Sequence, residues 1–191
     1  IRDSVASRGL GDVYKRQGED YLAVNTILMQ FIILAAFFLD AYAFSTEGIV
    51  GFTIGRKNKL SFLSVVKNSI QVSFYTALII AVLYLLFFKE IINVITDIEI
   101  LRFISYQHFI WIIIIPPIAS FCYQLDGIFI GATRTKDMRN MMAISLIAYI
   151  VSLVILVPNF ENTGLWMALL ISFIVRGITL GIKYPNLEKS I

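Results

Sequence analysis

The sequence predicts an all-α membrane protein with five transmembrane helices. Of its 191 residues, 58% are hydrophobic and only 15% are charged, and the mean hydropathy is +0.80. A soluble domain carries about 25% charged residues and about 45–50% apolar ones. Five apolar stretches are each long enough to cross the hydrocarbon core, which takes about 20 residues in a helix. The basic residues between these stretches gather in every second loop, which is typical of a chain that crosses a membrane repeatedly.

The first 17 residues, IRDSVASRGLGDVYKRQ, differ from the rest of the chain. They are polar and charged, and they lack periodicity. The string resembles a translated sequencing-adaptor remnant, so we interpret residues 1–17 as an adaptor-derived, non-native segment and leave it out of the fold prediction. A natural amphiphilic N-terminal arm is the alternative.

The predicted spans cover, approximately, residues 22–54, 69–88, 103–132, 141–157 and 165–182. The first span is too long for one upright crossing, so it must tilt, bend or protrude. Pro116 and Pro117 lie inside the third span, where a proline removes a backbone donor and kinks the helix. Such breaks are tolerated where neighbouring helices or a cavity satisfy the freed carbonyl groups.

The charges in the loops predict the orientation. The loop after the first span carries four basic residues and no acid, and the loop after the third is also basic. The loops after the second and fourth spans carry an excess of acid. By the positive-inside rule, the first, third and fifth spans end in the cytoplasm. We therefore expect a multi-pass protein of the cell membrane, with a cytoplasmic C-terminus and with the stretch GEDYLAV outside.

Four charged residues fall inside the predicted spans. Asp40 lies near the middle of the first span, and Glu47 follows seven residues later, so the two carboxylates share one helical face. Asp126 lies in the cytoplasmic half of the third span, and Arg176 lies about two thirds of the way along the fifth. A charge at this depth costs about 2.5–3.5 kcal/mol on insertion scales, so such residues usually face the bundle interior and serve a function.

These charges allow more than one interpretation. Asp126 and Arg176 either form a structural ion pair or belong to a working site. Asp40 and Glu47 repel each other unless one is protonated or a cation lies between them, which is the behaviour that cation carriage requires. For Glu47 alone, a solvated position near the cytoplasmic mouth is an alternative. Tyr123 and Thr133 share the Asp126 face and are candidate substrate-cavity residues.

Enzymatic motifs are missing from the sequence. The single histidine, His108, rules out a histidine metal site, and neither G-x-S-x-G nor G-x-x-x-x-G-K-[ST] occurs. We therefore expect neither an enzyme nor a metal centre nor a bound cofactor. Nothing in the sequence suggests a nucleic-acid partner.

Three stretches resemble one transporter family. QLDGIFIGATRTKDMRN (residues 124–140) is similar to the tenth helix and following loop of the multidrug and toxic compound extrusion (MATE) transporters, in particular their DinF-like branch. FFLDAYAFSTEGIVGFTIGRKN (37–58) is similar to the eighth helix of that branch. PNFENTGLWMALLISFIVRG (158–177) resembles the entry to the twelfth helix. The resemblance covers residues 20–185 in order.

The resemblance implies a twelve-helix fold in two six-helix lobes. Residues 18–191 would supply helices eight to twelve, a partial C-terminal lobe whose partner is the missing N-terminal lobe of the same chain. Asp126 matches the tenth-helix acid that serves cation coupling in some members, with Asp40 and Glu47 as further coupling candidates. The best-supported coupling acid of the DinF-like branch lies in the first helix, outside this chain. Arg176 would tune Asp126 as its ion-pair partner.

The function implied by the resemblance is secondary active antiport. A fragment of such a protein would help to export small organic compounds, cationic or amphipathic, across the lipid bilayer in exchange for H⁺ or Na⁺. Two alternatives stay open: a lipid-linked oligosaccharide flippase of the wider superfamily, and a non-transporting membrane scaffold.

Overall fold

The computed structural model describes the backbone of residues 2–189 and the side chains of residues 18–189. The described residues form five helices and no strand. The helices are α1 (Arg2–Gly55), α2 (Lys59–Ile95), α3 (Glu99–His108), α4 (Ile110–Gly131) and α5 (Thr135–Glu188). All except α3 are long and apolar enough to cross a membrane. The predicted all-α membrane fold is therefore confirmed.

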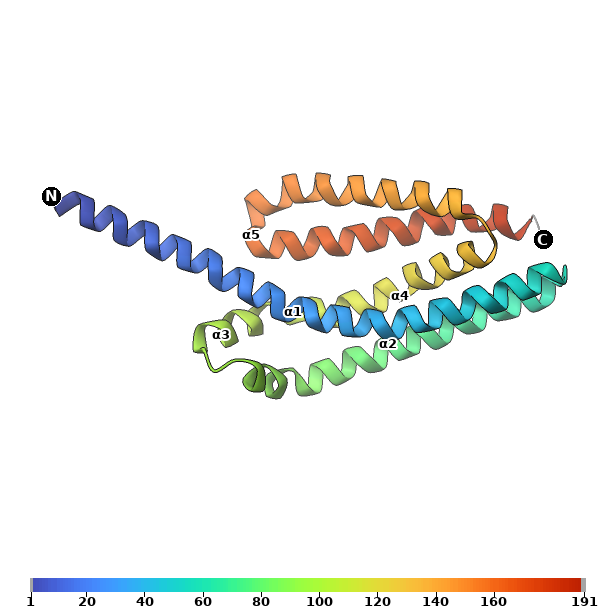
Figure 1. Cartoon of the computed structure of the whole chain (residues 1–191), viewed down its shortest axis with the longest axis horizontal. Helices are drawn as coiled ribbons and strands as arrows, with labels where there is room; N and C mark the ends of the chain where they lie inside the picture. The colour runs from blue at the N-terminus through green and yellow to red at the C-terminus, as the bar shows by residue number, and fades with distance from the viewer. Residues whose placement is uncertain (1, 190–191) are drawn as a thin grey trace.

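Helix α5 folds back on itself and forms two legs, each long enough to cross the hydrocarbon core of a membrane. Glu161 has non-helical backbone angles (φ 48°, ψ −128°), and the helix continues on both sides of it. Figure 1 shows the first leg (residues 135–160) running antiparallel to the second leg (residues 162–188). The return is tight, since a methyl group at Gly164 would overlap the Leu156 carbonyl group. The predicted fourth and fifth spans are these two legs, and only one residue between them leaves the helix.

Helix α1 is a single helix of 54 residues. Its N-terminal part extends past the other helices in Figure 1, which is one of the three ways expected for so long a span. The backbone of residues 2–17 continues this helix. Their side chains lie outside the described part of the chain, so the adaptor origin of residues 1–17 stays a prediction.

The third predicted span, 103–132, differs at its start from the helix that forms. Residues 103–108 belong to the separate helix α3, and α4 begins only at Ile110. Arg102 holds α3 against the end of α2, since its Nε donates to the Thr96 carbonyl (2.7 Å) and its Nη2 to the Asn93 carbonyl (3.0 Å). Helix α4 then runs without interruption through Pro116 and Pro117.

Helix α4 is the centre of the bundle and packs against α1, α2 and α5. Of the 18 most apolar consecutive residues of α4, 67% are buried inside the bundle, against 11% for the corresponding 18 residues of α5. Two apolar clusters lie along α1 and α4. One includes Leu28 and Ile115, and the other includes Val50 and Phe129. The stretch between these clusters contains the charged residues.

Three segments meet at one end of the bundle, which we call the basic end (Figure 1). They are the turn between α1 and α2 (residues 56–58), the turn between α4 and α5 (residues 132–134) and the last turns of α5. Lys59, which directly follows the turn between α1 and α2, connects this turn to the end of α5, because its Nζ donates to the Glu188 carbonyl at 3.0 Å.

Candidate functional site

The site begins with glycines that let α1 and α4 approach closely. Gly127 and Gly131 lie four residues apart, on one face of α4. A methyl group at Gly127 would overlap the Ala43 carbonyl of α1, and one at Gly131 would overlap the Glu47 carbonyl. Small residues at this spacing are a common means of bringing membrane helices together. We call this contact of Gly127 and Gly131 with Ala43 and Glu47 the seam. It places Asp126 beside the stretch of α1 that carries the other two acids.

A pocket of about 200 Å³ lies at this seam, between α1, α4 and both legs of α5. Its lining includes all four intramembrane charges predicted from the sequence. The remaining lining is mostly apolar. In full, the lining residues are Asp40, Ala43, Phe44, Glu47, Tyr123, Asp126, Gly127, Ile130, Met138 and Arg176.

Arg176 and Asp126 form an ion pair inside the bundle. Arg176 Nη2 lies 2.5 Å from Asp126 Oδ2, and the side chains are 23% and 12% exposed. The pair is incompletely satisfied, because Asp126 Oδ1 and Arg176 Nε are buried without a hydrogen-bond partner among the described residues. Asp126 lies five residues before the end of α4, which is about 8 Å along the helix axis from the basic end.

Asp40 and Glu47 are both half-buried. Their seven-residue spacing on a continuous helix carries both to the pocket side of α1. Neither takes part in an ion pair among the described residues, so the pocket contains three carboxyl groups and one guanidinium group.

The two predicted cavity residues are placed differently. Tyr123 lines the pocket, one helical turn before Asp126. Thr133 lies in the exposed turn that follows α4, with φ 57°, and does not line it. The sequence analysis did not single out the other five lining residues, which are Ala43, Phe44, Gly127, Ile130 and Met138. Being apolar, they carry no signal that separates them from the lipid-facing residues around them.

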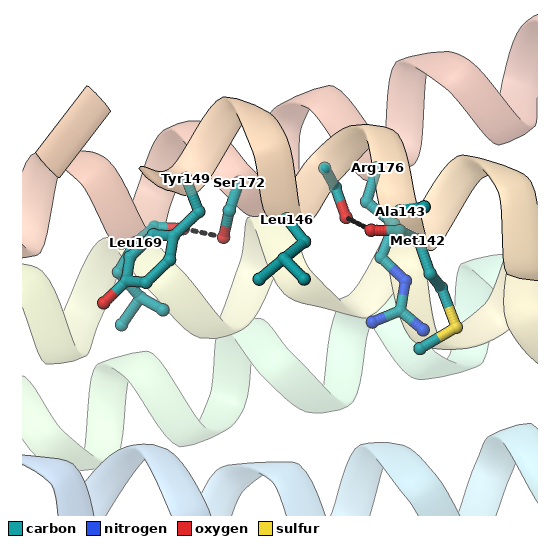
Figure 2. Close-up of a pocket in the computed structure, with 8 residues that line it drawn as sticks. Met142, Ala143, Leu146, Tyr149, Leu169, Ser172 and Arg176 are labelled. Atoms are coloured by element: carbon teal, nitrogen blue, oxygen red, sulfur yellow. Dashed lines mark hydrogen bonds between the residues drawn. The ribbon is translucent and has the colours of Figure 1, made fainter. Parts of the chain in front are cut away.

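Arg176 also lines a second cavity, a groove of about 360 Å³ between the two legs of α5. Figure 2 shows Arg176 at one end of this groove and Tyr149 at the other, with Leu146 between them. Met142, Ala143, Ser145, Leu169 and Ser172 complete the lining. The sequence analysis missed this groove, because nothing in an apolar stretch reveals which residues of two antiparallel helices will leave a gap between them.

The arrangement suits the binding of a cation inside the membrane. Carboxylate groups in a mainly apolar surrounding attract positive charge strongly, since the local dielectric constant is low. Within residues 18–189, no three His, Cys, Asp or Glu side chains are grouped closely enough to hold a metal ion. The acids are therefore spread around the pocket rather than gathered as one ligand set.

Comparison with known proteins agrees with the family resemblance of the sequence. A model of the MatE family matches residues 13–157. The chain is 35% identical over 165 residues to DNA damage-inducible protein F of Escherichia coli (strain K12), an alignment that covers 86% of this chain and 36% of that relative. No solved structure matches the chain.

Proposed function

Since this chain belongs to the MatE family, we propose that it is part of a secondary active transporter that exports small organic compounds, cationic or amphipathic, in exchange for H⁺ or Na⁺. It would act as the greater part of the C-terminal lobe, together with an N-terminal lobe of the same protein. The lipid bilayer and a small organic substrate are the other partners.

The observation that carries this proposal is the charged pocket. Three carboxyl groups face one guanidinium group in a space of about 200 Å³, inside helices that are long and apolar enough to span a membrane. Charges are costly at such depth and mark ion or substrate paths in membrane proteins. We assign Asp126 as the primary cation-coupling residue, with Asp40 and Glu47 as its partners.

Coupling follows from linkage between the cation and the conformation. A carboxylate that binds H⁺ or Na⁺ more tightly in one state than in another shifts the equilibrium between the two states. Movement of the two lobes about a central site would then expose that site to each side of the membrane in turn. Asp126 suits this role because it is buried and lies close to one end of the bundle.

The acidic character of the pocket favours an exporter of cations over a lipid-linked oligosaccharide flippase, whose substrate carries anionic phosphate groups. A carboxylate repels such groups, whereas guanidinium and ammonium groups bind them. The non-transporting scaffold makes no use of a charged pocket, and the same experiment distinguishes it.

The test uses a chimera in which residues 18–189 replace the aligned segment of the E. coli relative. We expect proteoliposomes containing the chimera to export a fluorescent organic cation when a proton or sodium gradient is imposed. Asp126→Asn should lower this gradient-driven export about tenfold or more, since it removes the charge that binds the coupling ion.

Asp97→Asn is the matched control, because Asp97 is fully exposed between α2 and α3, away from the pocket. It should export like the unmodified chimera. Full export by Asp126→Asn would remove Asp126 from the mechanism. A chimera that inserts and assembles but exports nothing under either gradient would refute the exporter.

A further inference from the structure

The ion pair between Arg176 and Asp126 lacks the features of a permanent structural link. A buried pair offsets the cost of desolvation only when its geometry is good and its remaining donors and acceptors are satisfied. Arginine and carboxylate groups achieve this with two parallel hydrogen bonds. Here one contact joins Nη2 to Oδ2, while Nε and Oδ1 are buried without partners among the described residues.

The groove between the legs of α5 offers Arg176 a second location. Arg176 lies between the pocket and this groove and lines both. Met142 lines the groove together with Arg176, and its flexible side chain can move aside. The hydroxyl groups of Ser145 and Ser172 donate to the Met142 and Leu169 carbonyls, which leaves their own oxygen atoms free to accept from a guanidinium group.

We propose that Arg176 is a displaceable counter-cation of Asp126, which leaves the pocket for the groove between the legs of α5 when a coupling cation takes its place. Resting on the proposed function, this inference adds how the cation gains access to Asp126. The exchange replaces one positive charge by another, so the charge of the pocket stays constant. Arg176 acts here as a positioning residue, because it controls the availability of Asp126.

Other groups around Arg176 fit the exchange. Asp40 and Glu47 face the pocket from α1, and Tyr123 faces it from α4. The sulfur of Cys122 is already engaged, since its Sγ donates to the Phe173 carbonyl at 2.8 Å. After Arg176 has left, the two acids of α1 would remain beside Asp126 and hold the incoming cation in the pocket.

The experiment measures how fast phenylglyoxal, a reagent for guanidinium groups, modifies Arg176 in the full 191-residue chain in lipid nanodiscs. Mass spectrometry gives the rate at Arg176 relative to Arg139, which is exposed. Asp126→Asn should raise this relative rate about tenfold, because it removes a hydrogen bond between charged groups. Raising Na⁺ at constant pH, or lowering pH at constant Na⁺, should also raise it.

Filling the groove tests the destination of Arg176. Ala143 lines the groove near Arg176, so Ala143→Phe should lower the relative rate at Arg176 and abolish its response to cations. Ile147→Phe is the matched control, since Ile147 lies on the same leg, is 62% exposed and does not line the groove. It should leave the rate unchanged. If Ala143→Phe prevents insertion, the smaller change Ala143→Val serves instead.

Two results would overturn the inference. One is a relative rate at Arg176 that responds neither to Na⁺ nor to pH, as a permanent pair would behave. The other is a normal cation response when the groove is filled. The measurement does not depend on transport, so a failed export assay would refute the proposed function alone and leave this test valid.

Discussion

Gln124 is a fully buried amide in the centre of the bundle. Its Oε1 lies 2.8 Å from the Thr46 hydroxyl group of α1, while its Nε2 has no partner among the described residues. The Thr46 hydroxyl group also lies 2.8 Å from the Tyr42 carbonyl group of its own helix. A single proton therefore serves two acceptors, and the link between α1 and α4 is a weak one.

The Thr46–Gln124 link predicts a strongly non-additive mutant cycle. Thr46→Val leaves the whole Gln124 amide unpaired and should destabilise the chain by about 1 kcal/mol. The double variant Thr46→Val/Gln124→Leu should have a free energy of unfolding close to that of the unmodified chain, because it lacks both polar partners. Denaturation with sodium dodecyl sulfate in mixed micelles measures these free energies of unfolding. Simple addition of the two single changes would contradict the prediction.

At the residue scale, the charged part of the site could be predicted and the rest could not. Asp40, Glu47, Asp126 and Arg176 stand out because a charge inside a span is costly, and all four line one pocket. Thr133 shares the Asp126 face only if the helix continues. Helix α4 ends at Gly131, and the positive φ of Thr133 turns the chain away.

Between whole helices, the seam of α1 and α4 determines the geometry of the pocket. Gly127 and Gly131 admit the backbone of α1 at Ala43 and Glu47, and the pocket opens beside this contact. The acids of α1 can approach Asp126 only as closely as these two glycines allow. The seam is thus the element that joins packing to the proposed function.

Adding methyl groups at this seam should separate the two helices. Gly127→Ala and Gly131→Ala each place a methyl group against a backbone carbonyl that cannot rotate away, and each should cost about 1–3 kcal/mol. Gly48→Ala on α1 is the matched control, since no atom lies within 4 Å of the added methyl group. Unfolding in mixed micelles measures the difference. A Gly127→Ala chain as stable as Gly48→Ala would show that the helices do not meet as described.

Prediction of the elements themselves succeeded where apolar length decides the outcome. The long apolar stretches became the long helices, and the two final spans became the legs of α5. The start of α4 differed, because Arg102 and its partners at the end of α2 hold residues 99–108 as a helix of their own. Hydropathy does not register such side-chain contacts with backbone carbonyl groups.

For the molecule as a whole, the main feature is the difference in charge between its two ends. The basic end, together with the adjoining first turns of α2 and α5, carries eight lysine and arginine residues and two acids. They are Arg56, Lys57, Lys59, Arg134, Lys136, Arg139, Lys183, Lys189, Asp137 and Glu188. At the other end, residues 89–102 contain three acids, Glu90, Asp97 and Glu99, against Lys89 and Arg102, and the return of α5 contains Glu161. By the positive-inside rule, we infer that the basic end faces the cytoplasm of the cell membrane.

Single cysteines at the two ends test this orientation. Cys122 is the one cysteine of the sequence, and a serine in its place can keep the hydrogen bond to the Phe173 carbonyl. The Cys122→Ser chain is therefore the cysteine-free protein into which each new cysteine is introduced. Asp97→Cys should react in intact cells with a maleimide that cannot cross the membrane, whereas Lys136→Cys should react only after the cells are opened. Both positions are exposed, so a difference in rate reports the side of the membrane rather than burial. The opposite pattern would place the basic end outside, and Asp126 would then lie near the outer surface.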